Sequence, residues 1–90
     1  MIVRILGEGR YDVATADLAG VEELDAALTR AVDDDDSDGF DTALAALVER
    51  VRKVGTLLPP DDLQTSELVV PHAGTSLGEV KQLLAQEGGA

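Results

Sequence analysis

Strand-like segments at the two ends of the chain constrain its fold most strongly. Residues 1–6 are largely apolar on both alternating faces, which is typical of a central strand, and residues 68–70 form a short apolar run that Pro71 closes. Gly7-Glu8-Gly9 is a turn signal of hairpin length, and residues 10–13 alternate in polarity behind it. Because these distant segments must meet to bury their apolar faces, the sequence predicts one small α+β unit.

The middle of the chain has the periodicity of two amphipathic helices. Each carries apolar residues three or four positions apart, and a polar break at residues 33–38 separates them. We expect Asp36 or Ser37 to cap the second helix and Gly55 to end it, with a loop over residues 56–66. Ser76-Leu77-Gly78-Glu79 is a capping box that predicts a third helix. The first apolar stripe is Leu18, Val21, Leu24, Leu28, Ala31, and the second is Phe40, Leu44, Leu47, Val51, Val54.

These elements assemble into one predicted architecture. The fold class is α+β, a small two-layer domain of order β-β-α-α-β-α with an antiparallel helical hairpin and a C-terminal helix. The sheet is predicted to have three strands in the order 2-1-3, with the third strand parallel to the first. We expect a single domain at residues 1–87 and a frayed C-terminal tail at residues 88–90.

The charge of the chain restricts its partners. Its formal net charge is −11 in 90 residues, so phosphate backbones and anionic lipid headgroups are repelled, and we expect no nucleic-acid binding and no direct membrane binding. A basic protein surface is the natural partner of such a field. There is no cysteine, and the only aromatic residues are Tyr11 and Phe40. An aliphatic core without large anchors is modestly stable, so a homodimer is an open alternative.

No motif for chemistry is complete. Asp34, Asp36 and Asp38 begin a D-x-D-x-D-G pattern, but the twelfth position of a calcium loop holds Ala45 instead of a bidentate Glu. His72 is the only imidazole, and Ser76 near it is explained as a helix cap. The Gly7-Glu8-Gly9 turn lacks the third glycine of a dinucleotide fingerprint. We therefore expect no catalytic, metal or cofactor-binding residue, and a protein that is not an enzyme.

Four short motifs carry a resemblance to a known family. Residues 2–5, 7–10, 66–71 and 76–80 read IVRI, GEGR, SELVVP and SLGEV, and together they resemble the PspA-associated protein family, PspAA. The likeness covers nearly the whole chain. Two positions depart from the familiar pattern, which often has Gln in place of Arg10 and an acid in place of Gly78.

The resemblance implies a non-enzymatic accessory or regulator. Its expected partner is a PspA-type protein, a long helical, membrane-remodelling scaffold of the envelope stress response in bacteria. The resemblance and the acidity together imply a cytoplasmic protein that reaches the inner membrane only through PspA. The predicted partner-binding residues are Glu8, Glu22, Glu23 and Asp25. The alternative is a self-associating structural module without any PspA contact.

Overall fold

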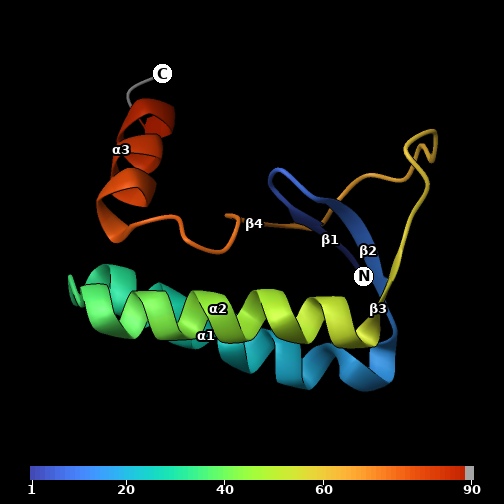
Figure 1. Ribbon diagram of the computed structural model, residues 1–90, viewed down its shortest axis with the longest axis horizontal. Helices are drawn as coiled ribbons and strands as arrows, with labels where there is room; N and C mark the ends of the chain where they lie inside the picture. The colour runs from blue at the N-terminus through green and yellow to red at the C-terminus, as the bar shows by residue number, and fades with distance from the viewer. Residues whose placement is uncertain (89–90) are drawn as a thin grey trace.

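A four-stranded mixed sheet forms one layer of the computed structural model, and a helical hairpin forms the other (Figure 1). The structure describes residues 1–88, with side chains described through residue 82. The strands are β1 (Ile2–Ile5), β2 (Gly9–Val13), β3 (Gly55–Leu57) and β4 (Leu68–Val70). The helices are α1 (Leu18–Asp33), α2 (Ser37–Val54) and α3 (Leu77–Gly88), and a 3₁₀ turn at Thr15–Asp17 precedes α1.

The sheet has the order β3-β2-β1-β4, which confirms the central position of β1. β1 is antiparallel to β2, with Val3 opposite Tyr11, and parallel to β4, with Val3 opposite Leu68. The predicted element order β-β-α-α-β-α is thereby confirmed. The predicted count of three strands is wrong, because Gly55–Leu57 pairs with β2 as a fourth strand.

The sequence does not predict β3, because three residues are too few to show the alternation of polar and apolar side chains that marks a strand. Its three residues, Gly-Thr-Leu, follow directly on the last turn of α2, where a helix stop and a loop were predicted. Gly55 ends the helix in extended backbone rather than in the left-handed region. A Cβ there would lie 2.6 Å from the carbonyl oxygen of Val51 and 2.9 Å from Cβ of Tyr11. Glycine therefore lets the chain turn from helix to strand against β2.

The core lies between the sheet and the helical hairpin. Val3, Ile5, Val13 and Val70 are the strand side chains of this core, and Ile2 of β1 is buried as well. The helices contribute the two stripes read from the sequence, of which Leu18, Leu24 and Val54 are only partly buried, and the buried members are Val21, Leu28, Ala31, Phe40, Leu44, Leu47 and Val51. This burial is the main stabilising term of the fold, because apolar area removed from water contributes about 25 cal/mol per Å².

α3 stands at the end of the hairpin where α1 joins α2 (Figure 1). Leu77 is buried and Val80 packs against the core, while Lys81 forms an ion pair with Asp35 in the joint, at 2.6 Å. The capping box is confirmed, since the backbone N–H of Glu79 donates to Ser76 Oγ at 3.1 Å. Gly88 is the last residue of α3, and residues 89–90 of the expected frayed tail lie outside the described residues.

Candidate functional site

Glu8 lies at the tip of the β1–β2 hairpin and contacts α2. The turn depends on Gly7 and Gly9, both at positive φ, a region that glycine adopts without steric cost. The Glu8 carboxylate accepts from Arg52 Nε at 2.8 Å and from Nη2 at 2.6 Å. This bond raises the pKa of Arg52 above its ordinary value. Arg52 offsets much of the negative charge that a partner would meet at Glu8. The role of Glu8 in partner binding stays a prediction.

The other three predicted contact residues lie in the first turns of α1. Glu22 and Glu23 are exposed, whereas Asp25 is half-buried, and burial raises the pKa of its carboxyl group. Glu22 and Asp25 are three residues apart and share one side of the helix. In the described part of the chain, no hydrogen bond or ion pair joins them to Glu8, whose carboxylate is bound to Arg52. The four acids thus come from two elements, three from α1 and one from the turn of the β1–β2 hairpin.

The acidic residues that join α1 to α2, called the joint here, have structural roles. Asp36 caps α2, because its Oδ1 accepts from the backbone N–H of Gly39 at 3.0 Å, and this selects Asp36 over Ser37 as the cap. Asp35 has a φ of 56°, a left-handed conformation that Asp tolerates better than most residues. Among the residues whose side chains are described, no group of three or more His, Asp or Glu side chains is arranged to hold a metal ion.

His72 and Ser76 are each engaged in local hydrogen bonds. His72 Nδ1 lies 3.0 Å from the carbonyl oxygen of Ala73, and the imidazole is exposed. The Ser76 hydroxyl donates to Glu79 Oε1 at 3.2 Å and accepts from the backbone of the same residue. These contacts orient Ser76 as a cap and leave its hydroxyl directed at Glu79.

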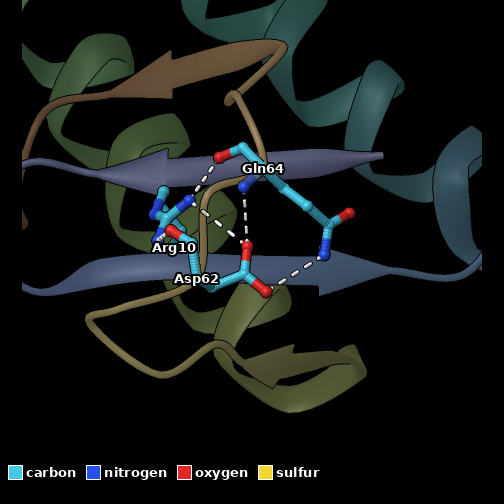
Figure 2. Close-up of polar contacts among 3 residues, drawn as sticks. All are labelled: Arg10, Asp62 and Gln64. Carbon is cyan, nitrogen blue, oxygen red and sulfur yellow. Dashed lines mark hydrogen bonds and ion pairs between the residues drawn. The ribbon is translucent and has the colours of Figure 1, made fainter.

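Arg10 fastens the loop after β3 to the sheet, which the sequence did not indicate (Figure 2). Its Nη2 donates to the carbonyl oxygen of Asp62 at 2.5 Å, and its Nη1 donates to that of Gln64. Asp62 Oδ1 also accepts from the backbone N–H of Gln64 at 2.8 Å. This hydrogen bond is the main reason why the pKa of the Asp62 carboxyl group is lowered. The hydrogen bond from the Gln64 side chain and the positive charge of Arg10 lower it further. Leu63, between the two fastened residues, is 96% exposed.

A shallow groove runs along the seam between α1 and α2. Its larger part has a volume of about 610 Å³ and reaches from Leu24 to the acidic joint. A smaller part of about 240 Å³ continues toward the end of α2, and Leu24 and Ala46 line both parts. Small residues at helical spacing, within or beside the two apolar stripes, line this groove. They are Ala27, Ala31, Ala43 and Ala46.

Comparison with known proteins identifies one family. The family model of the PspA-associated proteins, PspAA, matches residues 1–90, the whole chain. No curated protein and no solved structure matches the chain significantly. Among residues 1–88, no helix has the length and apolarity needed to cross a bilayer.

Proposed function

This chain belongs to the PspA-associated protein family, and on that premise we propose that it is a non-enzymatic accessory protein that binds a PspA-type scaffold. The expected setting is the envelope stress response, in which the scaffold remodels the membrane. The protein is then cytoplasmic and reaches the inner membrane only through its partner. The family match across the whole chain is the observation that carries this proposal.

The charge distribution supports binding to a basic protein surface. The net charge of −11 gives the molecule a negative field that attracts basic helices before contact. Glu22 and Glu23 are exposed on α1 and join no ion pair in the described part of the chain. Such peripheral charges act mainly on the rate of encounter, so they raise the association rate more than they slow release.

The test is a binding measurement with the purified PspA homologue of the same organism. We expect binding at low salt that weakens severalfold in 0.5 M salt, because the Debye length is then only about 4 Å and the surface charges are screened. The double variant Glu22→Lys, Glu23→Lys should slow association, as followed by surface plasmon resonance. The matched control is the double variant Asp61→Lys, Glu67→Lys, which changes the net charge by the same amount at two exposed residues outside α1.

The alternative, a self-associating structural module, makes a different prediction. If the PspA homologue shows no binding at low salt, the accessory role fails. Sedimentation equilibrium of the chain alone then decides whether the module associates with itself. A monomer at all concentrations would reject that alternative as well.

A further inference from the structure

The groove between α1 and α2 is built entirely from the helical hairpin. Among the side chains that the structure describes, every one that lines the groove belongs to the two helices or to their joint, and none comes from the sheet. Its floor consists of Leu24 and of small side chains, chiefly Ala27, Ala43 and Ala46. Small side chains on the floor let another helix approach both α1 and α2 closely, as helix packing at an axis separation of about 8–10 Å requires.

The groove has opposite charges at its two ends. Asp34, Asp36 and Asp38 outnumber Arg30 at the end near the joint. Arg50 and Lys53 outnumber Glu49 at the other end. Neither Arg50 nor Lys53 forms an ion pair in the described part of the chain, although the molecule is strongly acidic as a whole.

The length of the groove fits a helix of several turns. Its charged ends are marked by Asp36, the cap residue before α2, and by Lys53 near the end of α2, and at 1.5 Å per residue they are about 26 Å apart. A docked helix of about five turns covers that distance. Leu24 and Ala46, which line both parts of the groove, lie between the two ends and hold no charge.

The physical chemistry of the groove selects its occupant. An extended peptide needs a strand edge for its backbone hydrogen bonds, and a surface made of two helices offers none. A helix bonds its own backbone and needs only apolar contacts from the groove. An anionic lipid or a nucleic acid would be repelled at the aspartate end, and a second copy of this chain is disfavoured because each molecule carries a net charge of −11.

We infer that this groove binds one amphipathic helix of the scaffold, with the basic end of that helix at Asp34, Asp36 and Asp38 and its acidic end at Arg50 and Lys53. The inference rests on the proposed function and adds the binding face, the kind of segment bound and its direction. The docked helix lies against α1 and α2 as the third member of a small bundle, and the charges at the two ends select its direction.

A bulky residue in the groove tests the location. Ala46 lines both parts of the groove, whereas its neighbour Ala45 is exposed and lines neither. We expect Ala46→Trp to weaken binding of the full-length PspA homologue at least tenfold, and Ala45→Trp to change it less than threefold. Ala27→Trp and Ala26→Trp form a second matched pair on α1. Circular dichroism melting confirms that each variant is folded before binding is measured.

The possible outcomes distinguish failure of the proposed function from failure of the groove inference. If the unaltered chain does not bind the homologue, the proposed function fails and the groove inference fails with it. If the unaltered chain binds and both groove variants bind equally well, only the groove inference is overturned. Loss of binding in the groove variants and in their neighbours alike would also overturn it, because the effect would then not depend on the groove.

Cross-linking tests the direction. The chain has no cysteine of its own, so Asp38→Cys and Lys53→Cys each place one unique thiol at one end of the groove. Each variant receives a thiol-linked photoreactive group, is irradiated with the full-length homologue, and the products are mapped by mass spectrometry. We expect position 38 to label the basic end and position 53 the acidic end of the same scaffold helix. Reversed labelling, or labelling of both ends from each position, would overturn the inferred direction.

Discussion

Leu47 offers the most direct test of the helical hairpin as core. Its side chain is fully buried between the helices and the sheet, at 0% exposure. Leu47→Ala removes apolar contacts and leaves a cavity that a close-packed core fills only in part, so we expect a loss of about 2–4 kcal/mol in the free energy of unfolding. A chain of 90 residues has a total of only about 5–13 kcal/mol. The single change therefore removes a large share of the stability.

The assay is urea unfolding together with a thermal melt. A loss of about 3 kcal/mol lowers the melting temperature by about 12–24 °C in a domain of this size. The urea midpoint should fall while the slope stays constant, because the surface exposed on unfolding is nearly unchanged.

Leu63→Ala is the matched control, because it makes the same chemical change at a side chain that is 96% exposed. We expect it to alter the free energy of unfolding by less than about 0.5 kcal/mol. Equal effects at Leu47 and Leu63 would refute the reasoning, since burial would then not determine the cost. An unchanged melting temperature for Leu47→Ala would show that α2 is not part of the core.

Three further predictions address the cap, the turn and the loop. Asp36→Ala should lower the free energy of unfolding by about 1 kcal/mol, because the N–H of Gly39 loses its acceptor, and an unchanged urea midpoint would contradict the cap. Gly55→Ala should cost about 1–3 kcal/mol, because the new Cβ meets the Val51 carbonyl oxygen, and a wild-type melting temperature would show that the turn tolerates a side chain. The pKa of Asp62 is lowered from its ordinary value of 3.8, because the folded state favours the ionised carboxylate. Asp62 therefore contributes to stability above pH 3.8, and this contribution is lost as the pH falls through the lowered pKa. NMR titration of the Asp62 carboxyl carbon should give a midpoint below 3.8, and a midpoint at or above that value would show that the loop contacts do not hold its charge.

Local patterns in the sequence predicted the elements whose stability begins locally. The two-sided apolar character of residues 2–5 places β1 between β2 and β4, as observed. The helical stripes, the Asp36 cap and the Ser76 capping box are also found as expected. Each of these features depends on residues within about one turn of each other or on a periodic pattern, so a single segment contains the whole signal.

The candidate binding residues stay a prediction, and the sequence shows only part of their surroundings. The sequence marked Glu8, Glu22, Glu23 and Asp25 as acids available to a partner, but it could not show that Arg52 pairs with Glu8 across 44 positions. It also contained the alanines of the groove without indicating that they line one seam, because that depends on how α1 and α2 pack. The proposed partner follows from the family to which the chain belongs, not from charge or spacing.

By itself, the sequence determined which segments form the three helices and three of the four strands, which faces of them are apolar, and that the whole carries a charge of −11. Only the tertiary structure decided that Gly55–Leu57 forms a fourth strand, that Arg10 fastens the loop at Asp62 and Gln64, and that the helices leave a groove between them. The reason is the range of the interactions. A helix stripe or a cap is complete within a few residues of the sequence. Strand pairing and the groove, like the Arg10 contacts across more than 50 positions, exist only after folding has brought distant segments together.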